Sequence, residues 1–90
     1  MSESTNALPS VVLFTRHDCC LCEEALAEVE VARRARPFAL KVIDVDSDPE
    51  LAARYGLEVP VIELDGRKAF KYRVTSRELL RRLELGGRRG

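Results

Sequence analysis

The chain lacks an excess of charge of either sign. Its 90 residues include 15 lysines and arginines and 15 aspartates and glutamates, so the formal net charge is zero and the isoelectric point is about 6.6. Proteins that bind nucleic acid or an anionic membrane usually present a basic face, because phosphate groups must be neutralised. We therefore expect neither nucleic acid nor membrane among its partners.

Long apolar runs are also missing. No stretch approaches the roughly 18 residues that a membrane-spanning helix needs. Residues 1–9 contain an acid but no basic region followed by an apolar block, which a secretory signal would require. These absences predict a cytoplasmic protein.

The length and composition indicate one small domain. Hydrophobic residues make up 46% and charged residues 33%, which allows a modest core without a stabilising metal or disulfide. Residues 1–9 are polar and aperiodic, so we expect a flexible leader there. A folded domain should follow over residues 10–85 and a flexible tail over residues 86–90, and we expect a monomer.

All three cysteines and the only histidine lie between His17 and Cys22. An odd number of cysteines gathered in one place is the opposite of a secreted disulfide framework, so reduced thiols at rest are expected. Cys19 and Cys22 stand three positions apart. If a helix begins here they share one face, close enough for a disulfide whose Cα separation is roughly 4.4–6.8 Å.

The start of a helix also activates a thiol. Its free N–H groups and the positive end of its dipole favour thiolate over thiol, and they lower a cysteine pKa from about 8.5. We therefore predict a redox-active dithiol in which Cys19 is the nucleophile.

The cysteines lie between an apolar run and a helical pattern. Val11-Val12-Leu13-Phe14 is continuously apolar, which favours a central strand covered on both faces. Over residues 22–36 apolar residues recur at three-and-four spacing, and a proline then ends the predicted helix. Residues 38–46 favour a second strand, in which Asp44 and Asp46 are interpreted as turn residues. Strand, helix and strand in this order imply a parallel crossover.

The next stretch predicts a short helix and a hairpin. Ser47-Asp48-Pro49-Glu50 combines a capping box from Ser47 to Glu50 with an N-cap at Asp48 before a proline, and a glycine follows the expected helix over residues 51–55. Asp65-Gly66 supplies the positive φ angles of a two-residue turn. It separates two predicted antiparallel strands, residues 61–64 and residues 67–74.

The last predicted element is a helix. Thr75 and Glu78 fit a capping box, leucines follow at helical spacing, and the helix should end near residues 86–87. The expected fold class is therefore α/β, with the order β-α-β-α-β-β-α and a four-stranded mixed sheet carrying helices on both faces.

Three features together resemble the thioredoxin superfamily, and more closely its small glutaredoxin-like members. They are the Cys-x-x-Cys between the first strand and the first helix, the element order, and Val59-Pro60 immediately before the third strand. The resemblance covers roughly residues 10–84. It implies a thioredoxin-like fold and a thiol–disulfide oxidoreductase, with catalytic Cys19 and Cys22 forming a redox-active disulfide in place of a cofactor. It also implies that Val59 and Pro60 bind substrate, with a cis peptide bond before Pro60 and the Val59 backbone pairing with an extended substrate.

The sequence departs from glutaredoxins at two places. They usually have Pro-Tyr between the cysteines, where this chain has Cys20-Leu21, so the redox potential is left open. They also usually carry a Gly-Gly pair that helps to hold glutathione, where this chain has the bulky Phe70 and Lys71. Backbone cannot approach a peptide ligand as closely over such side chains as over glycine. We therefore expect a disulfide-containing protein as substrate, and a thioredoxin-reductase-type system or another thiol as reductant.

Two residues just before the cysteines, Arg16 and His17, each have two interpretations. Arg16 and His17 either stabilise the Cys19 thiolate or are solvated loop residues. Cys20 points away from the shared helix face and is expected to be incidental. No metal is expected, because the chain lacks a second cysteine pair and the three cysteines with His17 are too crowded to converge on one ion. The alternatives to an oxidoreductase are a metal or iron–sulfur binding module and a redox-inactive interaction domain.

Overall fold

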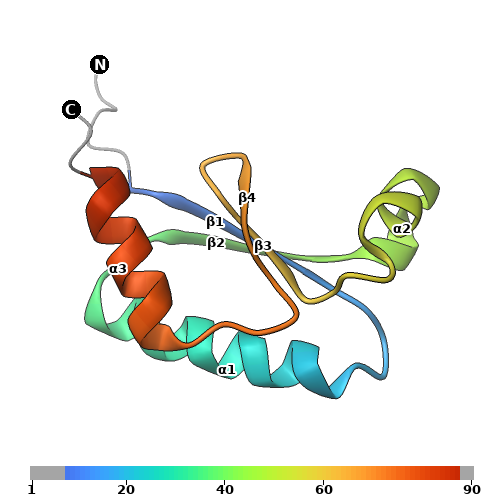
Figure 1. The fold of residues 1–90 in the computed structure, drawn as a ribbon, viewed down its shortest axis with the longest axis horizontal. Coiled ribbons are helices and arrows are strands. Elements are labelled where there is room, and N and C mark those ends of the chain that lie inside the picture. The colour runs from blue at the N-terminus through green and yellow to red at the C-terminus, as the bar shows by residue number, and fades with distance from the viewer. Residues whose placement is uncertain (1–7, 88–90) are drawn as a thin grey trace.

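A four-stranded sheet with helices on both faces forms the fold (Figure 1). The computed structural model describes residues 8–87. Along the chain the elements are β1 (Ser10–Thr15), α1 (Cys20–Ala35), β2 (Ala39–Asp44), the 3₁₀ turn η2 (Val45–Ser47), α2 (Pro49–Tyr55), β3 (Val61–Leu64), β4 (Arg67–Lys71) and α3 (Ser76–Gly87). Apart from η2, this is the predicted order β-α-β-α-β-β-α, so the predicted fold class is confirmed.

β1 lies inside the sheet, whose strand order is β2-β1-β3-β4. It runs parallel to β2 and antiparallel to β3, while β3 and β4 form the predicted antiparallel hairpin. At the hairpin turn Asp65 and Gly66 have φ angles of 51° and 86°, as an Asp-Gly turn requires. Because β1 has a partner strand on each side and helices over both faces, its continuously apolar sequence is accounted for.

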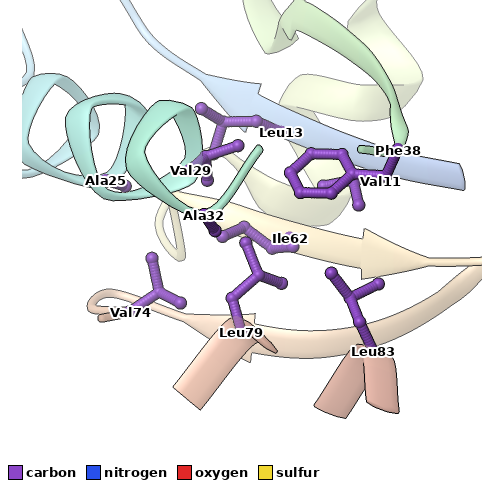
Figure 2. Packing of buried hydrophobic residues seen from close by; sticks show 10 residues of the cluster. All are labelled: Val11, Leu13, Ala25, Val29, Ala32, Phe38, Ile62, Val74, Leu79 and Leu83. Carbon is purple, nitrogen blue, oxygen red and sulfur yellow. The ribbon is translucent and has the colours of Figure 1, made fainter. Parts of the chain in front are cut away.

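Adjacent residues of β1 belong to two different cores. Leu13 faces α1 and α3, which lie together on one side of the sheet (Figure 1). Figure 2 shows this larger core, which consists of Val11, Leu13, Ala25, Val29, Ala32, Phe38, Ile62, Val74, Leu79 and Leu83. Phe14 faces the other way and packs with Val45, Tyr55 and Val61. The alternation of side chains along a strand thus connects the sheet to both helical layers.

Four predicted boundaries are wrong. α2 begins at Pro49 rather than at residue 51, because Asp48 is its N-cap. α1 begins at Cys20 rather than at residue 22, because Cys19 is its N-cap. β2 ends at Asp44 rather than at residue 46, because the Asp44 carboxylate accepts the Asp46 N–H at 2.9 Å and turns the chain into η2. β4 ends at residue 71 rather than at residue 74, because Tyr72 has a φ of 71°, outside the range of a strand.

The predicted helix caps are confirmed with one exception. Asp48 caps α2 by accepting the Glu50 N–H at 2.9 Å, whereas the Ser47 hydroxyl donates to the carbonyl of Asp44, so the capping box from Ser47 is wrong. At α3, the Thr75 hydroxyl oxygen accepts the Glu78 N–H at 3.1 Å and the Glu78 carboxylate accepts the Thr75 N–H at 3.3 Å. This reciprocal pair is the predicted capping box.

The predicted leader and tail fall largely on residues 1–7 and 88–90, which lie outside the described residues. They and the domain limits of residues 10–85 therefore stay predictions. Over residues 8–87, none of the helices is both long enough and apolar enough to span a bilayer.

Leu79 and Leu85 of α3 offer a matched test of the larger core. Leu79 is 0% exposed and Leu85 is 58% exposed. Leu79→Ala should lower the free energy of unfolding by about 2–5 kcal/mol, because it removes buried methyl groups and leaves a cavity. Leu85→Ala should change it by less than about 0.5 kcal/mol. Urea denaturation of both variants measures the difference, and equal losses would contradict the assignment of the α3 faces.

Candidate functional site

Cys19 and Cys22 form a close pair at the start of α1. Cys19 is the N-cap, with extended backbone angles, and its sulfur accepts the N–H of Cys22 at 3.1 Å. The Cα atoms are 5.2 Å apart and the two sulfurs are joined in a disulfide. The pairing expected from the spacing is therefore present.

The three cysteines differ in accessibility. Cys22 is only 4% exposed, Cys19 is partly exposed and Cys20 is exposed. The reason is the orientation of α1, whose buried side carries Cys22, Ala25, Val29 and Ala32 at three-and-four spacing. Any molecule that approaches the disulfide from solvent therefore meets the sulfur of Cys19 first.

The loop that carries Cys19 leaves the carboxyl end of β1. Asp18 has a left-handed φ of 59°, which aspartate tolerates better than most residues, and the chain turns there into α1. A hollow of about 290 Å³ lies beside the disulfide, and its lining includes both bonded cysteines, Val42 and Asp44. The pair is thus accessible from a concave surface between α1 and β2.

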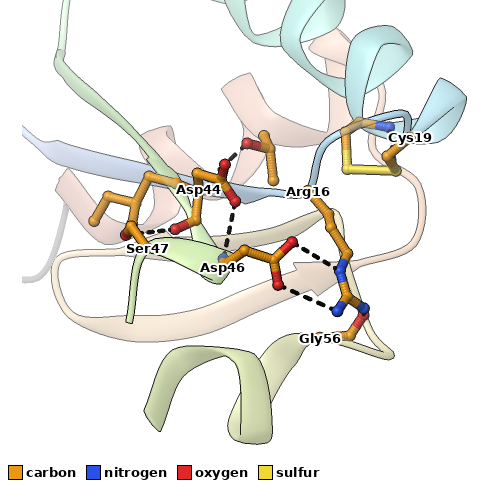
Figure 3. A network of polar contacts seen from close by, with 9 residues as sticks. Arg16, Cys19, Asp44, Asp46, Ser47 and Gly56 are labelled. Carbon is orange, nitrogen blue, oxygen red and sulfur yellow. Dashed lines mark hydrogen bonds and ion pairs between the residues drawn. A yellow bond between two sulfur atoms is a disulfide. The ribbon is translucent and has the colours of Figure 1, made fainter. Parts of the chain in front are cut away.

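The guanidinium of Arg16 is held by groups outside the cysteine loop. Nε and Nη2 donate to the two carboxylate oxygens of Asp46 at 3.1 and 3.2 Å, and Nη1 donates to the carbonyl of Gly56 at 2.9 Å. Figure 3 shows this side chain reaching away from the disulfide toward both partners. His17 is largely exposed, with Nε2 3.8 Å from an Asp18 carboxylate oxygen. The predicted thiolate-stabilising roles of Arg16 and His17 stay predictions.

Val59 and Pro60 lie near the same end of β1. The peptide bond between them is cis, as the resemblance implied. Phe14 near the end of β1 pairs with Val61, so Pro60 is level with the residues that follow Phe14 and lead to the cysteines. The Pro60 carbonyl accepts the Tyr72 N–H at 2.8 Å, which fixes the segment against the end of β4. A substrate-binding role for Val59 and Pro60 stays a prediction.

Ion pairs anchor the residues just before Pro60. Lys68 donates to the Glu58 carboxylate at 2.8 Å, and Lys71 lies 3.9 Å from its other oxygen. The hydrogen bond from Lys68 holds the pKa of Glu58 below its usual value, and the same bond raises the pKa of Lys68. Nearby, donation of the Tyr55 hydroxyl to Glu63 at 2.7 Å, together with burial, raises the pKa of Tyr55. Tyr55 is therefore a neutral hydrogen-bond donor across the physiological pH range.

The contacts of Arg16 with Asp46 and Gly56 were not found by sequence reasoning. The sequence predicts only a turn at Asp46 and only the end of a helix at Gly56. Both partners are distant in sequence, so no local pattern marks them. A metal site is not formed by the residues described, since no three histidine, cysteine, aspartate or glutamate side chains within residues 8–87 gather as ligands.

Comparison with known proteins supports the fold and places the chain in a family. Residues 10–84 match the family described as Glutaredoxin-like domain (DUF836). Uncharacterized protein Rv0508 of Mycobacterium tuberculosis is 32% identical in an alignment of 76 residues that covers 79% of this chain and 78% of that protein.

Two solved structures are similar over most of the chain. Target protein XcR50 from X. campestris is 30% identical with a TM-score of 0.70, and the match covers 83% of this chain and 96% of that one. A mutant thioredoxin from Halobacterium salinarum NRC-1 is 25% identical with a TM-score of 0.65, over 90% of this chain and 76% of that one. The family match covers most of the chain and the solved structures agree with its sheet and helices, so the chain belongs to the glutaredoxin-like domain family.

Proposed function

We propose that this protein is a thiol–disulfide oxidoreductase that reduces or exchanges disulfides of protein substrates. The observation that carries the proposal is the close pair at the start of α1, with Cys19 accessible and Cys22 buried one turn further along. A structural disulfide needs no such asymmetry, whereas a nucleophile and a resolving thiol do.

The proposed reaction has two steps. The thiolate of Cys19 attacks one sulfur of the substrate disulfide, so a mixed disulfide forms and the other substrate sulfur leaves as a thiolate that takes up a proton. The thiol of Cys22 then loses its proton and attacks the Cys19 sulfur, which releases the second substrate thiol. Two electrons pass to the substrate, and the protein is left with the Cys19–Cys22 disulfide.

The backbone around Cys19 suits the first step. An N-cap residue stands where the first N–H groups of a helix are unpaired and where the dipole is positive. One of these groups, the N–H of Cys22, already points at the Cys19 sulfur at 3.1 Å. A negative charge on that sulfur gains a stronger, charge-assisted hydrogen bond there.

The proposed substrate is a protein, and the proposed reductant is a cytoplasmic thiol system. In the proposal the backbone of Val59 pairs with an extended protein segment, and a thioredoxin-reductase-type system or another thiol recycles the oxidised form in the cytoplasm. Among the residues that the structure describes no third ligand joins the cysteine pair, which favours dithiol exchange over the alternative of a metal or iron–sulfur module.

Cys19 should be alkylated as a thiolate at unusually low pH. In a Cys20→Ser, Cys22→Ser variant, Cys19 is the only thiol, and the midpoint of its alkylation rate against pH should lie below the value of about 8.5 for an ordinary cysteine. The same protein unfolded in urea is the control and should return to the ordinary midpoint. A folded midpoint at or above the unfolded one would contradict thiolate stabilisation by the helix start.

Substitution of Cys19 and substitution of Cys22 should have different effects on the reaction. Cys22→Ser keeps the attacking thiol but lacks the resolving one, so a mixed disulfide with a protein substrate should accumulate on a non-reducing gel. Cys19→Ser should trap nothing, and Cys20→Ser should retain nearly full activity. Equal trapping by the Cys19 and Cys22 variants would contradict the assigned roles. Absence of any trapping or turnover would favour a redox-inactive interaction domain.

Glutathione should be a poor specific reductant. Phe70 and Lys71 stand where glycines usually admit the ligand, and the Ser76 N–H at the start of α3 already donates to the Glu28 carboxylate at 2.6 Å. A glutathione carboxylate that binds at this helix start has to displace that bond. Turnover should therefore show no saturation with glutathione, whereas a thioredoxin-reductase-coupled assay should saturate. Saturable turnover in the glutathione assay would overturn this prediction.

A further inference from the structure

Arg16 connects three segments that are far apart in the sequence. It follows β1 directly, and its guanidinium bonds to Asp46 of η2 and to Gly56 at the end of α2, 30 and 40 residues further along. A guanidinium is planar and its donors are fixed in a fork, so three bonds to two partners define its position closely. The side chain therefore fixes the cysteine loop, residues 16–19, relative to both partners.

The backbone of the turn that carries Asp46 is itself held in place. The Asp46 N–H donates to the Asp44 carboxylate at 2.9 Å, and the Ser47 hydroxyl donates to the Asp44 carbonyl at 2.7 Å (Figure 3). Val45 between them is 0% exposed and belongs to the smaller core. These contacts restrain the turn to which Arg16 is bonded.

The position of Gly56 leaves no room for a side chain. A Cβ on this residue would lie 3.3 Å from Nη1 of Arg16 and would overlap the carbonyl oxygen of Ala52. Glycine therefore avoids the overlap with Ala52 and leaves Arg16 its full contact with the Gly56 carbonyl. Gly56 begins the proline segment, residues 56–60, whose other end is held by the bond from the Tyr72 N–H to the Pro60 carbonyl.

The positive charge of Arg16 is compensated by the Asp46 carboxylate beside it. Both oxygens of Asp46 face the guanidinium, so the net charge offered to a sulfur anion is small. All of its hydrogen bonds among the described residues go to Asp46 and Gly56, and none goes to a cysteine. The geometry favours a mechanical connection over electrostatic stabilisation of a thiolate.

We infer that Arg16 is a positioning residue for substrate binding, which holds the proline segment at the distance from Cys19 that an extended protein substrate requires. This inference rests on the proposed oxidoreductase function. It adds the residue that aligns the cysteine loop with the proline segment. Without the hydrogen bonds of Arg16 to Asp46 and Gly56, the proline segment occupies the aligned position for a smaller fraction of the time. The apparent affinity for the protein substrate falls by that fraction.

Two substrates and five variants, one of them a control, test it. The first substrate is a protein disulfide, which needs the proline segment, and the second is a small aromatic disulfide, which has no backbone to pair. Arg16→Gln should raise KM for the protein disulfide about tenfold with little change in kcat, and it should leave the rate with the small disulfide and the pH midpoint of Cys19 alkylation unchanged. Asp46→Asn should act in the same direction, and the double variant should be no worse than the poorer single one.

Arg16→Lys separates geometry from charge. Lysine keeps the positive charge but lacks the fork, so KM should stay raised. Arg33→Gln is the matched control, since Arg33 pairs with Glu30 of α1 at 3.7 Å and lies outside the site. It should behave as the wild type with both substrates. If Arg16→Gln fails to fold, Asp46→Asn carries the same KM measurement.

The outcomes discriminate between the two proposals. A wild-type protein inactive on both substrates would overturn the proposed function together with this inference. An active wild type whose Arg16→Gln variant loses both substrates equally, loses neither, or shows a raised alkylation midpoint would overturn the inference alone. Recovery of the wild-type KM by Arg16→Lys would also overturn it, because charge would then suffice.

Discussion

β1 forms backbone hydrogen bonds to β2 on one side and to β3 on the other, and its side chains alternate between two cores. Leu13 and Phe14 are both buried, on opposite faces. A slip of one residue would exchange those faces and place each side chain in a core shaped for the other. The register of β1 is therefore strongly specified. Since the cysteine loop starts where β1 ends, that register also fixes the origin of the candidate site.

The difference between the two paired cysteines follows from the same helix packing that forms the core. Cys22 precedes Ala25, Val29 and Ala32 on the side of α1 that faces the sheet, so burial of that side covers the Cys22 sulfur. Cys19 is outside the helix as its N-cap and stays partly exposed. An amphipathic helix whose N-cap is Cys19 is therefore sufficient to expose one thiol of the pair and bury the other.

Polar contacts, in addition to the packing of Val59 against the smaller core, hold the segment opposite the cysteines. The proline segment is joined to η2 and the cysteine loop through Arg16, to β4 through the ion pair of Glu58 with Lys68, and again through the carbonyl of Pro60. The side chains of the ion pair are partly exposed, and such a pair by itself stabilises a fold only slightly. Together these polar contacts restrict a loop that has few apolar side chains in either core. A site of this kind keeps its geometry while its surface stays open to a large substrate.

Much of the fold was predictable because its signals are local. The Asp65-Gly66 turn, the Asp48 cap and the Cys-x-x-Cys at a helix start each depend on residues within a few positions of one another, and the structure contains all three. The resemblance to glutaredoxin-like proteins added the cis bond before Pro60, which spacing alone does not specify. The end of β2 is not predictable from the pattern because the β-branched Val45 follows Asp44, although side-chain bonds already turn the chain there.

By itself the sequence determined the order of the elements, the pairing of Cys19 with Cys22 and the burial of β1, since periodicity and spacing along the chain carry that information. Only the tertiary structure decided the partners of Arg16. The sequence shows an arginine near two cysteines and therefore suggests an electrostatic role, whereas the fold presents Asp46 and Gly56, which no local pattern connects to it. The physical reason is that a long, flexible side chain bonds to whatever groups the packed elements place within its reach, and that placement exists only after the sheet and its helices have assembled.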